Sequence, residues 1–321
     1  MNKLGDFLGR NGIQVILLLS FTAAWFLVPN FGTPANMIAL GLKVSVVGIV
    51  ACSMMFCLAA GDFDLSVGSV AAISGVLLGL LLNQGMSIAV SIALVLALGA
   101  FIGSFNGFVI SKLGINALIT TLATMQIVRG AAFIMNEGQS VSINHPAILN
   151  FGRFAYPIFD VDGRSLGVNS STWLMVAIFA IFGFLLYKTI FGRNALAIGG
   201  NPEAAELAGI PVARHKIIIF AIQGVMAVIA GLALTSQNLI GDPKASEGLE
   251  LEVISACVLG GVSLSGGVAR MSGVISGVLF MGIITKSMDL LQVDSFWQRV
   301  ATGAVLLAAV IFDRIKNRPK S

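Results

Sequence analysis

Long stretches without a charged side chain restrict how this chain can fold more than any other feature. No Asp, Glu, Lys or Arg occurs in residues 65–111, which is room for two helices of about 20 residues each. Backbone polar groups in lipid are satisfied only within helices or closed barrels, and these runs do not alternate with period two as barrel strands do. The pattern therefore predicts membrane-spanning helices. Other charge-free runs are 11–42, 44–61, 113–128, 165–187, 217–241, 253–269, 271–285 and 300–312.

The composition leads to the same class of protein. Hydrophobic residues make up 57% of the 321 residues, charged residues 11%, and the mean hydropathy is +0.95. This excludes a soluble enzyme, a disordered chain and a secreted disulfide scaffold. The 37 glycines fit closely packed membrane helices. We expect an all-α, polytopic membrane protein with about ten transmembrane helices in a single domain, residues 1–321.

The placement of Lys and Arg predicts the topology. We expect crossings to begin near residues 13, 37, 65, 87, 115, 172, 214, 250, 271 and 295, with both termini cytoplasmic. Most basic residues then lie on the inner side, and the net charge of +4 reflects topology rather than nucleic-acid binding. The inner set is Lys3, Arg10, Lys112, Lys188, Arg193, Arg214, Lys216, Arg270, Arg314, Lys316, Arg318 and Lys320.

Two connections are longer than the others. The outward loop at about 136–172 contains several Pro and Gly residues and predicts an irregular extracytoplasmic cap. The inward loop at about 191–214 contains Asn201-Pro202-Glu203, which favours a helix start, and Gly209 and Pro211, which end a helix. A helix of about two turns cannot cross a bilayer, so we expect it along the cytoplasmic surface. The alternative is a polar connector without further function.

This inward segment resembles the coupling loop of ABC importer permeases, which docks on an ATPase subunit. The wider resemblance, over residues 29–313, is to the monosaccharide-importer permeases of the ribose, xylose, galactose and arabinose branch. Asp62, Phe63 and residues 116–118 depart from the common family pattern and are similar to its L-arabinose members. The matching stretches are 61–69, 119–125 with Arg129-Gly130, 200–205, 258–264 and 308–313.

The resemblance implies a permease subunit that forms the translocation pathway for a monosaccharide, with a pentose such as L-arabinose as the expected sugar. It implies a homodimer in the lipid of the bacterial inner membrane, two cytoplasmic ATPase subunits that use ATP-Mg, and an extracytoplasmic sugar-binding protein. No cofactor and no nucleic acid are expected on this chain. The coupling residues that the resemblance implies are Asn201, Pro202, Glu203, Ala204, Ala205, Glu206 and Gly209.

Polar side chains inside the apolar runs are candidates for the sugar pathway, because a hydroxylated sugar needs hydrogen-bonding partners that replace water. Alternatively, the threonines bond to their own helix backbone or across to neighbouring helices, and Arg129 caps carbonyl groups or pairs with Glu137 or Glu252. The pathway candidates are Asn116, Thr120, Thr121, Thr124, Gln126 and Arg129, and Asn106 and Gln223 are further polar residues of this kind.

Two aspartates near the second predicted crossing form a separate group. Asp64 precedes Leu65 and Ser66 and is placed to cap the following helix. We expect Asp62, Asp64 and Ser66 to support a gate or a helix cap, with direct contact to the sugar or the ATPase as the alternatives.

Several kinds of active site are missing from the sequence. No Gly-Lys dipeptide occurs, so the chain has no phosphate-binding loop, and a partner is expected to hydrolyse ATP. No catalytic residue and no metal site is expected, and Cys52, Cys57 and Cys257 are interpreted as buried packing. The competing hypotheses are a stand-alone secondary sugar transporter or channel, and a membrane-embedded enzyme.

Overall fold

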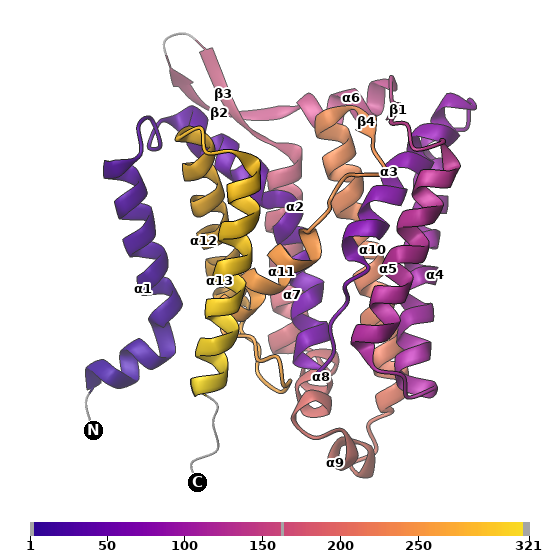
Figure 1. The fold of residues 1–321 in the computed structure, drawn as a ribbon, viewed down its shortest axis with the longest axis vertical. Coiled ribbons are helices and arrows are strands. Elements are labelled where there is room, and N and C mark those ends of the chain that lie inside the picture. The colour runs from indigo at the N-terminus through magenta and orange to yellow at the C-terminus, as the bar shows by residue number, and fades with distance from the viewer. Residues whose placement is uncertain (1–2, 162–163, 317–321) are drawn as a thin grey trace.

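A computed structural model describes residues 3–161 and 164–316 and shows a bundle of helices that run roughly along one axis (Figure 1). We call the end that carries α9 the inner end, and the end with the β2–β3 hairpin the outer end. The helices are α1 (Lys3–Leu27), α2 (Pro34–Ala59), α3 (Val67–Asn83), α4 (Ile88–Lys112), α5 (Ala117–Met135), α6 (Pro146–Arg153), α7 (Ser170–Lys188), α8 (Ile190–Gly200), α9 (Pro202–Leu207), α10 (Val212–Asn238), α11 (Leu249–Leu259), α12 (Met271–Leu290) and α13 (Ser295–Lys316). The strands are β1 (Val141–Ser142), β2 (Ala155–Val161), β3 (Arg164–Asn169) and β4 (Ile240–Gly241).

Helices begin within three residues of every predicted crossing position except the first, since α1 begins at Lys3 rather than near residue 13, and they differ in length. Within residues 3–161 and 164–316, six helices are long and apolar enough to cross a membrane: α2, α4, α5, α7, α10 and α12. α1, α3 and α13 contain shorter apolar stretches. α11 has only 11 residues, about 16 Å of helix, which is half the thickness of a bilayer core. The spanning helix predicted near residue 250 is therefore corrected to a half-length helix near the middle of the bundle (Figure 1), from which residues 260–270 continue without helix to the start of α12.

Both long loops contain more regular structure than the sequence predicted. The outer loop folds into β1, α6 and the β2–β3 hairpin, and β1 pairs antiparallel with β4, so that Val141 lies opposite Gly241. These two small sheets correct the all-α prediction, although the chain is mostly helical. The inner loop contains α8 in addition to the predicted short helix. Glycines at both ends of α8 obscured its helical pattern in the sequence.

α2 is the centre of the bundle. Every residue from Val44 to Ala59 is buried, as expected for a helix that is apolar on all sides and surrounded by other helices. Beside it, Gly99, Gly103 and Gly107 repeat every four residues along α4 and face α10. A Cβ atom on Gly103 would clash with the carbonyl oxygen of Phe220, so the two backbones are in direct contact.

Candidate functional site

The chain leaves its helical path directly after α2. Gly61, with φ of 83°, donates its N–H to the carbonyl of Leu58, and Asp62 donates its N–H to the carbonyl of Cys57, at 2.9 and 3.0 Å. This pair of bonds is a Schellman motif, which ends a helix at a glycine. The trace then runs without helix from the inner end toward the middle of the bundle, where α3 begins (Figure 1).

Asp64 starts a chain of buried polar groups that joins three elements. Its Oδ1 accepts the backbone N–H of Ser66 at 2.8 Å and the Ser66 hydroxyl at 2.6 Å. The Asn106 side chain on α4 donates to the Ser66 hydroxyl at 3.1 Å, and the Thr124 hydroxyl on α5 donates to Asn106 at 2.6 Å. All four side chains are buried. This network, Asp64–Ser66–Asn106–Thr124, fixes the start of α3 against α4 and α5.

Asp62 lies next to the network but has a different partner. The Lys216 ammonium group on α10 is 2.6 Å from Asp62 Oδ2, and both side chains are mostly buried. The ion pair ties the corner after α2 to the first turns of α10. From the sequence, Lys216 supported only the predicted topology. Its pairing with Asp62 could not be recognised, because the two residues lie more than 150 positions apart.

The predicted pathway residues of α5 fall on two faces. Thr120, Thr121 and Thr124 are buried, whereas Gln126 is exposed. The Thr121 hydroxyl donates to the carbonyl of Ala117 in its own helix, as the alternative interpretation held, and the Thr120 hydroxyl has no partner among the described residues. Exposed Asn116 caps the start of α5, since its Oδ1 accepts the Leu118 N–H at 2.8 Å.

Arg129 anchors a loop. Its guanidinium donates to the carbonyls of Pro243 and Ala245, each at 2.7 Å. Arg129 therefore caps carbonyl groups, as one of the alternatives held, rather than pairing directly with Glu137 or Glu252. The anchored loop leads into α11. A Cβ atom on Gly68 would lie 2.5 Å from both the Ser246 carbonyl oxygen and a carboxylate oxygen of Glu250. The first turn of α3, α5 and the start of α11 therefore meet in the interior.

α9 has the start that the sequence predicted. Asn201 accepts the Ala204 N–H on its side chain at 2.9 Å, and Pro202 occupies the first turn. Ala205 is buried against its own chain, whereas Leu207 is 91% exposed, and Gly209 adopts φ of 84° after the helix. Leu207 was not among the predicted coupling residues. A leucine next to two glutamates in a polar loop was the available signal.

Stacked rings hold α8 between its neighbours. The Phe191 ring stacks on Phe56 of α2, with centroids 5.5 Å apart, and on His215 of α10, with centroids 5.8 Å apart. Asn194 also lies within hydrogen-bond distance of His215, at 3.0 Å. α8 is thus fixed to both α2 and α10, and α9 projects from it at the inner end (Figure 1).

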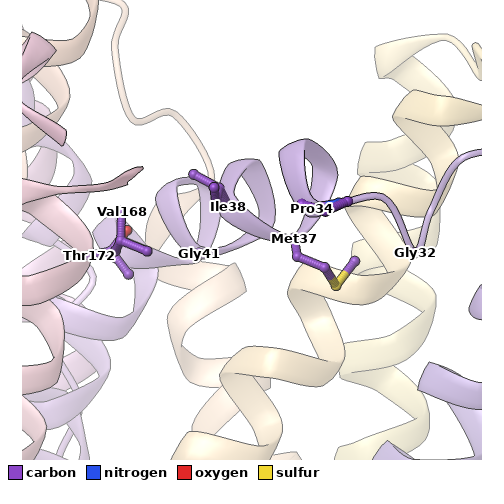
Figure 2. Close-up of a pocket in the computed structure, with 7 residues that line it drawn as sticks. All are labelled: Gly32, Pro34, Met37, Ile38, Gly41, Val168 and Thr172. Carbon is purple, nitrogen blue, oxygen red and sulfur yellow. The ribbon is translucent and has the colours of Figure 1, made fainter. Parts of the chain in front are cut away.

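The pockets at the outer end are unsuited to a sugar. One, of about 370 Å³, lies between the starts of α2 and α7, where Thr172 supplies the only polar side chain among its lining residues (Figure 2). A second, of about 310 Å³, is lined by aliphatic and aromatic side chains and Ser236. Neither pocket is lined by any of the predicted pathway residues. Within the described ranges, no cluster of three His, Cys, Asp or Glu side chains has the arrangement of a metal site.

Comparison with known proteins shows similarity to membrane permeases over nearly the whole length of the chain. Residues 36–310 match the protein family described as the permease component of the branched-chain amino acid transport system. The chain is 52% identical to the L-arabinose transport system permease protein AraH of Escherichia coli (strain K12), over 96% of this chain and 92% of that protein. It is 45% identical to the L-arabinose ABC transporter permease protein AraH of Azospirillum brasilense, over 98% and 90%. It is 39% identical to the ribose import permease protein RbsC of Bacillus subtilis (strain 168), over 99% and 94%.

Proposed function

Because the chain belongs to the branched-chain amino acid transport system permease family, and is a membrane permease component of an ABC sugar importer, we propose that it forms the pathway for L-arabinose across the bacterial inner membrane. The observation that carries the proposal is the similarity to L-arabinose permeases over almost the entire chain. Identity is higher with the two arabinose permeases, 52% and 45%, than with the ribose permease, 39%. Ribose is the second candidate sugar.

The active importer contains two copies of this chain, with α5 facing the pathway between them. The supporting observation is Gln126, an exposed amide among apolar side chains of α5, where Ile119 is 64% and Ile127 is 70% exposed. A polar side chain in a spanning helix is costly against lipid and is found facing protein or a water-filled cavity. Asn116 lies on the same exposed side. Thr124 and Arg129 hold the helix through hydrogen bonds to α4 and to the loop before α11, and Thr120 and Thr121 are buried on the side away from Gln126.

The energy comes from ATPase subunits that hydrolyse ATP-Mg and dock on α9 at the inner end. Exposed Leu207 is the apolar anchor, and Glu203 and Glu206 beside it supply charge for orientation. A sugar-binding protein delivers its ligand at the outer end, on the segments 136–172 and 238–250. Closure of the ATPase subunits moves α9 and switches the pathway between outward-open and inward-open states.

Uptake measurements test the substrate and the energy source together. A strain without its own pentose transporters receives this chain with its candidate ATPase and binding protein, and uptake of labelled L-arabinose, ribose and a hexose is measured. We expect L-arabinose to accumulate only when all components are present. Preferential ribose uptake would change the sugar. Uptake by this chain alone, driven by an ion gradient, would replace the importer with a stand-alone secondary transporter.

The docking surface has its own test, because a second exposed leucine is available as a control. Leu207→Ala is expected to weaken binding of the ATPase subunit by at least about 1 kcal/mol, which binding assays on the purified components measure. Leu113→Ala removes an exposed leucine between α4 and α5 and leaves α9 intact. Equal ATPase binding by both variants would remove Leu207 from the docking surface.

A further inference from the structure

The corner that ends α2 has a counterpart 200 residues later. α11 ends at Leu259, and Gly261, with φ of 80°, donates its N–H to the carbonyl of Val258 at 2.8 Å. Val262 then donates its N–H to the carbonyl of Cys257 at 3.1 Å, so the corner repeats the Schellman motif of Cys57 and Gly61. The sequence also repeats Leu-Ser after the glycine, at 65–66 and 264–265. Two helices therefore end in the same corner and continue into non-helical segments.

The 260–270 segment meets the end of α2 next to the end of α8. The Gly267 N–H donates to the carbonyl of Ala59 at 2.9 Å and joins the second segment to the end of α2. Gly199 of α8 packs against this bond. A Cβ atom there would clash with the Ala59 carbonyl oxygen and would lie 2.6 Å from the Gly267 nitrogen. Gly266 closes the other side, since its Cβ atom would lie 2.6 Å from the Gly199 carbonyl oxygen. We call Ala59, Gly199 and Gly267 the glycine junction.

Gly199 of the glycine junction is separated from α9 by two residues, Gly200 and Asn201. Gly200 ends α8, and Asn201 already caps α9 through its side chain. Contacts at the junction are between backbones, so no side-chain rotamer is available to absorb a displacement. Close-packed protein interiors have low compressibility and transmit strain. A shift of α9 along or across the inner end is therefore passed to α2 and to the 260–270 segment.

We propose that the glycine junction transmits movement of α9 to α2 and, through the 260–270 segment, to α11. Gly199 is the positioning residue that makes this transmission possible. The inference rests on the proposed importer function, because it assumes that an ATPase moves α9. It adds the point at which that movement reaches the pathway. α2 leads through the corner at Gly61 to Asp64 and the buried polar network, and α11 begins beside the loop anchored by Arg129. Both interior elements are thus reached from one contact.

The adjacent glycine provides a matched control. Gly199→Ala places a methyl group between two backbones, whereas a Cβ atom on Gly200 has no heavy atom of a neighbouring element within 4 Å. Both variants are assembled with the ATPase and the binding protein in proteoliposomes, and sugar transported per ATP hydrolysed is measured. We expect Gly199→Ala to keep ATP hydrolysis but to lower this ratio about tenfold or more. Gly200→Ala is expected to match the unmodified importer.

An unchanged ratio for Gly199→Ala, or an equal loss for both variants, would overturn the role of the junction. If instead the unmodified assembly fails to transport sugar with ATP, the proposed function fails first. A measurement without substitutions covers the case in which Gly199→Ala does not assemble. Hydrogen exchange of the peptides that cover 53–62 and 258–270 is compared between the nucleotide-free and ATP-trapped importer. Protection in both is expected to change together with that of 200–210, and constant protection would contradict the proposal.

Discussion

Thr124 and Asp64 were assigned separate roles from the sequence, one in the pathway and one in a gate or cap, and the structure connects them through Ser66 and Asn106. The connection has a physical reason. Asp64 is only 1% exposed, and a buried carboxylate is costly unless hydrogen bonds satisfy it. The network therefore works first as support for the non-helical segment before α3. A role in gating follows if that segment moves.

Substitutions of two threonines on α5 distinguish the stabilisation that comes from the network from that of any buried hydroxyl group. Thr124→Val removes a hydrogen bond between helices and leaves Asn106 Oδ1 without its donor, so we expect the free energy of unfolding to fall by about 1 kcal/mol. Thr121→Val removes only a bond to the carbonyl of Ala117 in the same helix and is expected to be nearly neutral. Unfolding titrations in mixed micelles give both values. Equal losses would mean that burial, rather than the network, sets the cost.

At the scale of elements, glycines determine how the helices approach one another. Gly99, Gly103 and Gly107 let α4 lie against α10 backbone to backbone, and Gly61 and Gly261 end α2 and α11 in left-handed corners. The many glycines of the composition thus divide into packing positions and corner positions. The sequence predicted close packing in general terms. It did not distinguish these two uses.

The packing role predicts opposite outcomes for two helical glycines. Gly103→Ala forces the Phe220 carbonyl away and is expected to lower the free energy of unfolding by about 1–3 kcal/mol. Gly130→Ala on α5 meets no atom of a neighbouring element within 4 Å and is expected to be neutral or stabilising by up to about 1 kcal/mol. Thermal unfolding in detergent compares them. Tolerance of alanine at residue 103 would show that α4 and α10 do not make this backbone contact.

For the whole molecule, the arrangement of the ends agrees with an even number of crossings. α1 begins and α13 ends at the inner end, where α9 also lies, and the β2–β3 hairpin projects from the outer end (Figure 1). The basic residues near these helix ends favour the cytoplasm for the inner end. The number of crossings and the orientation stay predictions. They can be tested directly because the native thiols of Cys52, Cys57 and Cys257 are buried.

Single cysteines at two exposed positions report the orientation. Ile158→Cys lies on β2 at the outer end, and Leu207→Cys lies on α9 at the inner end. We expect a membrane-impermeant maleimide to label residue 158 in intact cells and residue 207 only after permeabilisation. The unmodified chain, with its buried thiols, is the control. Labelling of residue 207 from outside would place α9 away from any cytoplasmic ATPase and remove the basis of the coupling mechanism.

The sequence by itself determined where most of the long helices lie, how α9 starts at Asn201 and Pro202, and which transporter class the chain resembles. These features depend on local properties: runs of apolar side chains, caps within three residues, and contiguous motifs. Only the tertiary structure decided that α11 is half a helix, that Asp62 pairs with Lys216, that Arg129 binds carbonyls of the loop before α11, and which face of α5 is open. Each of these depends on the packing of residues far apart in the chain. A charge-free run has the same appearance in the sequence whether its backbone continues as a helix or turns at a glycine against a neighbouring element.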